Sequence, residues 1–511
     1  MNHQRKNLSI SIIGGGASCI SLLHHLVLKT KKRPPFESLR VVIYEKKGSV
    51  GPGNAYQTDY ADLLLNRDAK FMSIDNDHPE HFWEWLSQRP EITVRKEKFM
   101  PRSLFGLYLK DSFETSICRA LEKNIHIRVE YSEVIQLIKA EKKYRLITKG
   151  REVEEHDVVI LCIGNPHLKD HYHLSGQEQY IHNAYPLKRA LAPITKDTHV
   201  GVIGSGLTAV DIAIALRQQG HEGAISFLSR SGELPAVRGP VQPHRLTNLT
   251  NESLRSLIKQ KEDMISLRDF VRLLRKEFQD GEIHWRDILF TKQELKMNLR
   301  ERLMNDLDQV EANGVKQSIL AAINEVIEMF WRHLSKKDKQ LYLERFDRYF
   351  QAKRNPMPVC NAKKILHLIE IGQLSVKAGL QYMGYYQDGS FYALMQDDEQ
   401  LEFDWVINAT GPVRHLEGQS EAGLIGAMLS KGYAIKNPWG GLETDFGTGA
   451  LVDRNNQTDP HLRAIGHVTC GTYYYTSSLE MIAKHASCIA QDLVKWMDTS
   501  TSGGKRASLS V

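Results

Sequence analysis

The sequence has few cysteines, and none of them lies in an arrangement that supports dithiol chemistry. Its 511 residues include six cysteines, and no two of these form a C-x-x-C pair. A redox-active dithiol or a cysteine-rich metal site therefore has no local support, and we predict no metal. Six thiols in a chain of this length are typical of reduced, mostly buried residues in an intracellular protein.

The chain also lacks long apolar runs and a strong excess of charge of one sign. No apolar run reaches the ~18 residues that a membrane span needs, and glycines and histidines interrupt the apolar stretch near the N-terminus, which argues against a signal peptide. Lys and Arg number 67 against 61 Asp and Glu, a net charge of +6. This small excess of positive charge does not indicate a nucleic-acid partner. We expect a cytoplasmic protein with neither a nucleic-acid nor a membrane partner; nothing in the sequence indicates an oligomeric state.

A glycine-rich turn near the N-terminus lies inside a strand–helix–strand pattern. Residues 8–13 read as a buried strand, a helix pattern follows the turn, and the next apolar strand, 41–44, ends at an acidic residue. In such a unit a pyrophosphate lies on the amides at the helix start, and the acidic residue accepts hydrogen bonds from a bare ribose. We predict FAD binding here, at Gly14, Gly15, Gly16, Ala17, Ser18 and Glu45. Cys19, in the usual place of a small residue, is expected to be a buried, unreactive thiol.

The same pattern returns at residues 198–230, with a different residue after the second strand. That strand ends in Ser229-Arg230, and an arginine fork with a neighbouring hydroxyl suits a 2′-phosphate. Arg238 is expected to share this role. We therefore predict NADPH rather than NADH in the second turn, bound by Gly204, Ser205, Gly206, Leu207, Thr208, Ser229 and Arg230.

Each glycine turn is followed later by short strands and by an apolar strand that ends in a glycine, at Gly164 and at Gly411. Both glycines are predicted to approach a cofactor closely. The repetition predicts an α/β fold with two nested Rossmann-like dinucleotide-binding domains and a helical insertion. The expected segments are an FAD-binding part at 1–195, an NAD(P)-binding part at 196–250, the helical insertion at 251–355, a second NAD(P)-binding part at 356–405, a C-terminal FAD-binding part at 406–497 and a disordered tail at 498–511.

The expected insertion is charged, poor in glycine and helical in its apolar period. Two apolar faces stand out, one made of Leu267, Val271, Leu274 and Phe278 and the other of Ile319, Ile323, Val326, Ile327 and Phe330.

Residues 63–73 resemble a segment of flavin-dependent monooxygenases that have two dinucleotide-binding domains. Asn66 is followed six residues later by Met72 and then by Ser73. In that family these residues lie against the flavin ring. The resemblance implies that Asn66 is catalytic through positioning, and that Met72 and Ser73 contact the cofactor. The alternative, in which Asn66 merely caps a turn, stays open.

Near the C-terminus, residues 464–471 precede a helix expected to begin near Ser478. In two-domain flavoproteins this turn places amides at the pyrimidine edge of the flavin, which implies that Gly466 and His467 contact FAD. Many relatives have Asp in the place of His467. This histidine either titrates with flavin reduction or is a hydrogen-bonded structural residue. Val134, on the short strands after the first turn, is also predicted to contact the cofactor.

A wider resemblance covers most of the chain, including residues 51–56, 101–106, 203–208, 285–286 and 354–358. These segments are similar to a bacterial group of FAD/NAD(P)-binding proteins related to amine N-hydroxylating monooxygenases. The resemblance implies that NADPH reduces FAD, and that a flavin C4a-(hydro)peroxide then passes one oxygen atom from molecular oxygen to a small amine or sulfur substrate. Two alternatives stay open: a flavin reductase, oxidase or dehydrogenase without oxygen insertion, and an FAD-binding sensor or interaction protein.

Overall fold

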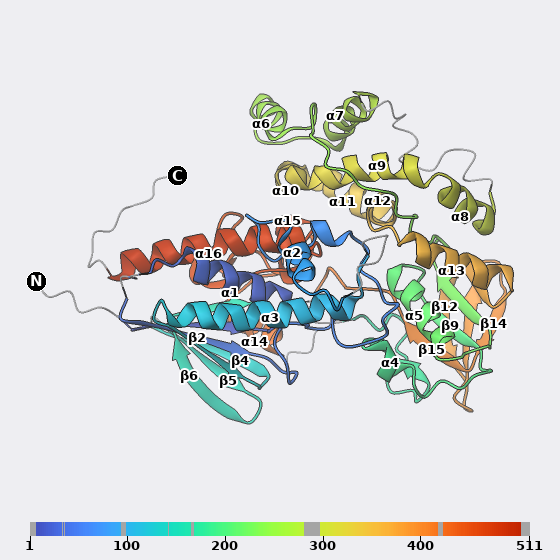
Figure 1. Ribbon diagram of the computed structural model, residues 1–511, viewed down its shortest axis with the longest axis horizontal. Coiled ribbons are helices and arrows are strands. Elements are labelled where there is room, and N and C mark those ends of the chain that lie inside the picture. The colour runs from blue at the N-terminus through green and yellow to red at the C-terminus, as the bar shows by residue number, and fades with distance from the viewer. Residues whose placement is uncertain are drawn as a thin grey trace, which may run out of the picture. The chain divides into compact units, whose positions relative to one another are not determined.

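The structure is a computed structural model that describes residues 7–32, 34, 36–92, 99–141, 143–164, 168–280, 297–416 and 423–501. The chain forms two compact units. The first consists of residues 1–58, 68–166 and 414–511, and the second of residues 59–67 and 167–413 (Figure 1). None of the described helices is long and apolar enough to cross a membrane.

These units correct the expected boundaries at three places. The second unit begins at residue 167 rather than 196, ends at 413 rather than 405, and takes in residues 59–67. For residues 167–195 and the end of the unit the cause is strand pairing, because a two-residue strand, β8 (Tyr180–Ile181), pairs with β15 (Trp405–Asn408) in the second unit. So short a strand leaves no apolar run in the sequence, and only its partner identifies it.

The first unit is built on a six-stranded sheet with the order β16-β17-β7-β1-β2-β3. All neighbours are parallel except the pair β16–β17. The strands are β1 (Asn7–Ile13), β2 (Ser38–Tyr44), β3 (Ile125–Glu130), β7 (Val158–Leu161), β16 (Ala450–Val452) and β17 (Thr458–Ala464). Strand β7, near the centre, is a continuous buried apolar run, as expected of a parallel sheet that is covered on both faces.

Helices and a smaller sheet complete the first unit. Figure 1 shows α1, in dark blue, between α3 and the red α16, and α1 packs against both. The helices are α1 (Ala17–Lys29), α2 (His81–Ser87), α3 (Arg102–Leu121), α14 (Leu424–Lys431), α15 (Cys470–Tyr473) and α16 (Leu479–Thr501), with 3-10 turns η1 (Ala69–Phe71) and η5 (His467–Thr469). An antiparallel sheet joins β4 (Val134–Ala140), β5 (Lys143–Thr148) and β6 (Arg151–His156). Residues 498–501 were expected to belong to a disordered tail, but they continue α16. The rest of that expected tail, residues 502–511, lies outside the described residues.

The second unit repeats the plan around a five-stranded parallel sheet with the order β11-β10-β9-β15-β8. Besides β8 and β15, its elements are β9 (Val200–Ile203), β10 (Ile225–Ser229), β11 (Leu374–Ala378), α4 (Leu187–Ala190), α5 (Leu207–Gln218) and α13 (Val359–Glu370). An antiparallel sheet joins β12 (Leu380–Tyr385), β13 (Phe391–Met395) and β14 (Gln400–Phe403). The core between α5, α13 and the parallel sheet includes the fully buried Val202, Ile212 and Ile365.

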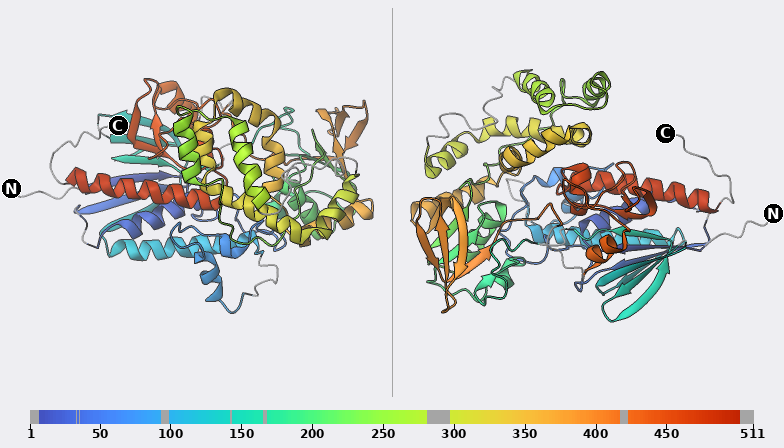
Figure 2. Two further views of the ribbon diagram at one scale, coloured as in Figure 1. Left: turned by 90° about the horizontal axis from the view of Figure 1, so that it is seen from above. Right: turned by 180° about the vertical axis from the view of Figure 1, so that it is seen from behind.

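Residues 251–354 of this unit are helical wherever the structure describes them as an element. Figure 2 shows these helices in green and yellow, stacked beside one another. They are α6 (Asn251–Gln260), α7 (Leu267–Asp280), α8 (Leu299–Asp308), α9 (Val310–Ala322), η4 (Ile323–Glu325), α10 (Ile327–His333), α11 (Lys336–Arg345) and α12 (Asp347–Arg354).

The two predicted apolar faces differ in how they are buried. All five residues of the second face are buried, but they lie on α9, η4 and α10 rather than on one helix, because the 3-10 turn interrupts it. Of the first face, on α7, Phe278 is fully buried. The other three residues of that face, Leu267, Val271 and Leu274, are only partly covered. Trp285 and Arg286 lie outside the described residues.

Candidate dinucleotide-binding sites

The first cradle, which we define as residues 14–18 with Glu45, begins at a glycine that no other residue can replace without strain. Gly14 follows β1 with φ of +100°, and a Cβ on it would stand 2.4 Å from the carbonyl oxygen of Cys162. Its amide donates to the Tyr44 carbonyl at 2.8 Å. Positive φ and backbone crowding together require glycine at this turn.

The helix that follows is open to an anion at its start. Gly16 is the N-cap of α1, with φ of −83° and ψ of −167°; no side chain caps the helix, and its first turn holds no acidic residue. A Cβ on Gly16 would meet only Gly53 Cα, at 3.7 Å. The first-turn amides therefore have no protein side chain as partner, and the helix dipole favours negative charge there. This cradle fits the pyrophosphate of a dinucleotide.

Glu45 lies at the mouth of this cradle, at the end of β2. The residue is 8% exposed, and its carboxylate accepts the Gly15 amide at 2.7 Å and the Lys47 amide at 2.8 Å. These two bonds fix the carboxylate while leaving further lone pairs for a ribose hydroxyl. The ribose contact itself stays a prediction.

Two other predicted residues lie at the same edge of the first sheet, because carboxyl ends of parallel strands meet there. Gly164 follows β7 with φ of +64°, and a Cβ on it would meet no atom within 4 Å. Gly466 follows β17 with φ of +91°, and its Cβ position is 3.2 Å from Ser18 Oγ. His467 begins η5 directly after it. Val134, 6% exposed, begins β4.

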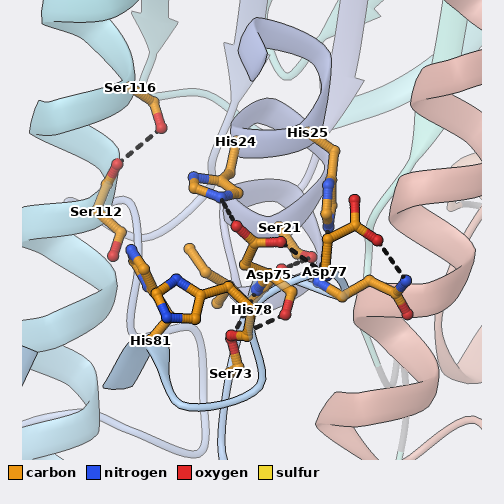
Figure 3. A network of polar contacts seen from close by, with 12 residues as sticks. Ser21, His24, His25, Ser73, Asp75, Asp77, His78, His81, Ser112 and Ser116 are labelled. Atoms are coloured by element: carbon orange, nitrogen blue, oxygen red, sulfur yellow. Dashed lines mark hydrogen bonds and ion pairs between the residues drawn. The ribbon is translucent and has the colours of Figure 1, made fainter. Parts of the chain in front are cut away.

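Met72 and Ser73 are both buried, but the hydroxyl of Ser73 is engaged within its own loop. Ser73 Oγ lies 3.0 Å from the Asp75 carbonyl and 2.8 Å from the His78 carbonyl, and it accepts the Asp75 amide at 2.9 Å (Figure 3). This hydroxyl therefore shapes the loop, and a contact of Ser73 with a cofactor stays a prediction. Met72 is 6% exposed and follows η1.

A buried network of histidines and carboxylates ties this loop to α1. His24 Nε2 lies 2.9 Å from Asp75 Oδ2, and Ser21 Oγ donates to the Ile74 carbonyl at 2.6 Å (Figure 3). Burial opposes the charge of Asp75, but the hydrogen bonds from His24 and the Asp77 amide outweigh it and hold the pKa of that carboxyl below its usual range. The sequence analysis missed this network, whose one local signal is a pair of histidines on an apolar helix.

Two further histidines near this network are held neutral. Desolvation by burial, with the neighbouring His24, lowers the pKa of His25 and that of His81 to about 4 each. The His81 ring hydrogen-bonds the Tyr108 hydroxyl at 2.7 Å. The network therefore combines a buried hydrogen bond between His24 and the Asp75 carboxylate with two neutral imidazoles at pH 7.

The second cradle, residues 204–208 with Ser229, repeats the geometry of the first. Gly204 has φ of +117°, a Cβ on it would stand 2.7 Å from the Ala409 carbonyl oxygen, and its amide donates to the Leu228 carbonyl at 2.7 Å. Gly206 is the N-cap of α5, with φ of −83° and ψ of −166°, no side-chain cap and no acidic residue in the first turn. A Cβ on Gly206 would meet nothing within 4 Å. Leu207 and Thr208 form the first turn, and Gly411 follows β15 with φ of +78°.

The two serines of the second cradle bond to each other and to the loop behind them. Ser205 Oγ lies 3.0 Å from Ser229 Oγ and 2.6 Å from the Glu233 carbonyl oxygen, and Ser229 Oγ accepts the Gly232 amide. Arg230, the next residue, is exposed, and its guanidinium forms no ion pair with any described residue. This leaves it able to bind a phosphate.

Arg238 Nε donates to the main-chain carbonyl of Asn66 at 3.0 Å, and this bond ties residues 59–67 to the second unit. The expected share of Arg238 in phosphate binding stays a prediction. The Asn66 side-chain amide makes no hydrogen bond within the described residues, which gives no support to a turn-capping role.

The cysteines near the first cradle are inert. Cys19 is fully buried, and burial together with the charge of Glu45 raises the pKa of its thiol. Burial, with the neighbouring Cys19, likewise raises the pKa of the Cys162 thiol. The expectation that Cys19 is buried is confirmed. A thiol held protonated is a poor nucleophile, and the lack of reactivity itself stays a prediction.

Comparisons with known proteins cover the first cradle with a family match and the whole fold with solved structures. Residues 11–166 match a protein family described as FAD-NAD(P)-binding. YdhS, an uncharacterised protein of Escherichia coli K12, is 20% identical over 459 residues, which cover 79% of this chain and 83% of YdhS.

Two solved structures share the fold. One is DfoA bound to FAD, the cadaverine monooxygenase of desferrioxamine biosynthesis from Erwinia amylovora, with 12% identity, 95% and 94% of the two chains covered and a TM-score of 0.57. The other is the bacillithiol disulfide reductase Bdr from Staphylococcus aureus, with 12% identity, 96% and 99% covered and a TM-score of 0.52. The family match thus covers the first cradle, and the two solved structures show a fold that the chain shares with DfoA and Bdr.

Proposed function

We propose that the protein is an FAD-dependent, NADPH-consuming monooxygenase that transfers one oxygen atom to the nucleophilic nitrogen or sulfur of a small substrate. The observation that carries the proposal is the pair of cradles, alike in backbone geometry but different in the residue after the second strand. Glu45 offers acceptors to a bare ribose, and Arg230 offers donors to a 2′-phosphate. An FAD site and an NADPH site in one chain support electron transfer from nicotinamide to flavin.

The chain's own residues would bind and orient the two cofactors. The first-turn amides of α1 would hold the FAD pyrophosphate, and the amides after Gly466 would stabilise negative charge on the reduced ring. Arg230 and the first turn of α5 would bind NADPH. Asn66 would position the nicotinamide or substrate through its side-chain amide. Bound FAD supplies the two-electron chemistry that couples NADPH oxidation to oxygen reduction.

The state of the thiols favours this reaction over dithiol reduction. A dithiol reductase needs a thiolate close to the flavin, whereas the pKa values of Cys19 and Cys162, near the first cradle, are raised by burial. Overall, one NADPH, one O2 and one proton would convert an amine to a hydroxylamine, with NADP⁺ and water as the other products.

The test uses purified, FAD-loaded protein. It is reduced with NADPH without oxygen, mixed with oxygenated buffer and a panel of amines and thiols, and assayed for hydroxylated product and hydrogen peroxide. We expect one substrate to give product in proportion to the NADPH consumed, and Asn66→Ala to divert that NADPH to hydrogen peroxide. Stoichiometric hydrogen peroxide with every substrate would indicate an oxidase or reductase. FAD binding without oxidation of either nicotinamide would indicate a sensor or interaction protein.

A further inference from the structure

Residues 168–172 lie at the carboxyl edge of the second sheet, where no sequence motif had placed them. Leu168 forms a backbone bridge with Pro412, just after the glycine turn that follows β15. The buried Asn408, last residue of β15, donates from its side-chain nitrogen to the Lys169 carbonyl at 3.2 Å. One end of this segment is therefore fixed beside the second cradle.

The other end of the segment approaches the end of β10. Arg230 lies close enough to influence the ionisation of both His171 and Tyr172 electrostatically. The centroid of the Tyr172 ring lies 6.3 Å from that of the His171 ring. It lies 6.4 Å from the centroid of the Tyr382 ring, on β12, in an edge-on arrangement. Tyr172 also packs on the core that includes Leu228. The segment thus spans the second cradle from β15 to β10.

The segment concentrates positive charge at this place. Lys169 and His171 are exposed, and the structure gives neither an ion pair with a described residue. Asp170 is the one carboxylate among them, and its oxygens accept the amides of Leu174 and Ser175 at 3.0 and 2.7 Å. The Lys169 ammonium and the His171 imidazole, a cation once protonated, suit a phosphate dianion near Arg230. The aromatic rings next to them suit an attached purine nucleoside.

We propose that Lys169, His171 and Tyr172 complete the site for the adenosine 2′-phosphate end of NADPH, and that His171 makes selection of NADPH over NADH depend on pH. This inference rests on the proposed function, which assigns NADPH to the second cradle. Lys169 and His171 would bind the 2′-phosphate with Arg230. Tyr172 would contact the adenine, which NADPH and NADH share.

The direction of the pH effect follows from the charges around His171. Burial and the cations of Lys169 and Arg230 lower the pKa of His171, and the Asp170 carboxylate opposes them, so the free protein carries a neutral imidazole at pH 7. A bound phosphate dianion favours the imidazolium, so binding takes up a proton. Affinity for a 2′-phosphate at His171 therefore falls as pH rises. The phosphate's own second ionisation, near pKa ~6, acts in the opposite direction.

The experiment measures the binding of two nucleotide probes, so its result does not depend on whether the protein turns over a substrate. Adenosine 2′,5′-bisphosphate and 5′-AMP are titrated calorimetrically into FAD-loaded protein between pH 6 and 8. The variants are His171→Gln, Lys169→Gln, Tyr172→Ala and Arg230→Ala. The matched control is His126→Gln, an exposed histidine on β3 of the first unit.

At pH 6 we expect His171→Gln to weaken bisphosphate binding about tenfold, the worth of one charge-assisted hydrogen bond, and to leave AMP binding unchanged. Its bisphosphate affinity should then rise or stay level toward pH 8, unlike that of wild type. Lys169→Gln should weaken bisphosphate binding at every pH. Tyr172→Ala should weaken binding of both probes, and the control should match wild type.

Two failures can be told apart. If His171→Gln keeps the wild-type pH profile while Arg230→Ala selectively loses the bisphosphate, this inference is wrong and the NADPH assignment stands. If Arg230→Ala also binds the bisphosphate as wild type does, the proposed cofactor of the second cradle is wrong as well.

Discussion

The substitution Gly16→Ala, which adds one methyl group, should lower the affinity for FAD without lowering the stability of the fold. The φ of −83° and ψ of −167° at Gly16 are open to any L residue, and a Cβ there would find only ordinary contact, with Gly53 Cα at 3.7 Å. Gly16→Ala should therefore change the free energy of unfolding by less than ~1 kcal/mol. The methyl group would, however, stand where the pyrophosphate must approach the amides of α1.

The expected loss of FAD affinity follows from the amides that the methyl group obstructs. One hydrogen bond between a backbone amide and a charged phosphate is worth about 1.5–3 kcal/mol, so losing one weakens binding roughly 10- to 150-fold. Gly14→Ala, by contrast, should lower the stability of the fold itself. At φ of +100°, with a carbonyl oxygen 2.4 Å from the new Cβ, it should cost roughly 2–4 kcal/mol of folding stability.

The assay titrates apo-protein with FAD, follows the flavin fluorescence, and measures urea unfolding of the same samples. Gly423→Ala is the matched control. Gly423 is also an extended N-cap, of α14 in the first unit, and no atom lies within 4 Å of its Cβ position. We expect wild-type stability with weak FAD binding for Gly16→Ala, and wild-type values of both for the control. Undiminished FAD affinity in Gly16→Ala would refute the placement of the pyrophosphate on this helix.

The remaining predictions concern the second cradle and the buried network. Arg230→Ala should raise the KM for NADPH roughly 10- to 100-fold and leave that for NADH unchanged in steady-state assays; an unchanged KM for NADPH would contradict the assignment. The pKa values of His25 and His81 are lowered to about 4, so both imidazoles stay neutral in the folded protein while those of the unfolded chain take up protons below their ordinary pKa of 6.5. The free energy of unfolding therefore falls as the pH drops from 6.5 to 4. Urea midpoints should therefore drop between pH 7 and 5, and less so in His81→Asn, which removes one of the two groups. Asp75→Asn, which removes the buried carboxylate that hydrogen-bonds His24, should lower the unfolding free energy by about 1.5–3 kcal/mol at pH 7; an unchanged value would show that this carboxylate does not stabilise the fold.

The sequence by itself determined the features that depend on neighbouring residues. Buried strands, the start of each helix and the glycines of both turns follow from apolar periodicity and local backbone sterics, which operate over a few residues. Gly14 and Gly204 both have the positive φ expected of such turns. The repeat of the pattern was enough to predict two dinucleotide-binding domains, and the helix expected near Ser478 begins at Leu479.

Tertiary structure alone decided what depends on residues far apart in the chain. The place of residues 167–195 in the second unit depends on the pairing of β8 with β15. Residues 59–67 join that unit through contacts such as the bond from Arg238 to the Asn66 carbonyl, 172 positions away. Likewise His24 meets Asp75 only when a loop packs on α1. Residues 168–172 are tied to the second cradle by contacts with Pro412 and Asn408, about 240 positions further along the chain. Such contacts leave no periodic trace in sequence, because their geometry is set by packing between elements rather than within them.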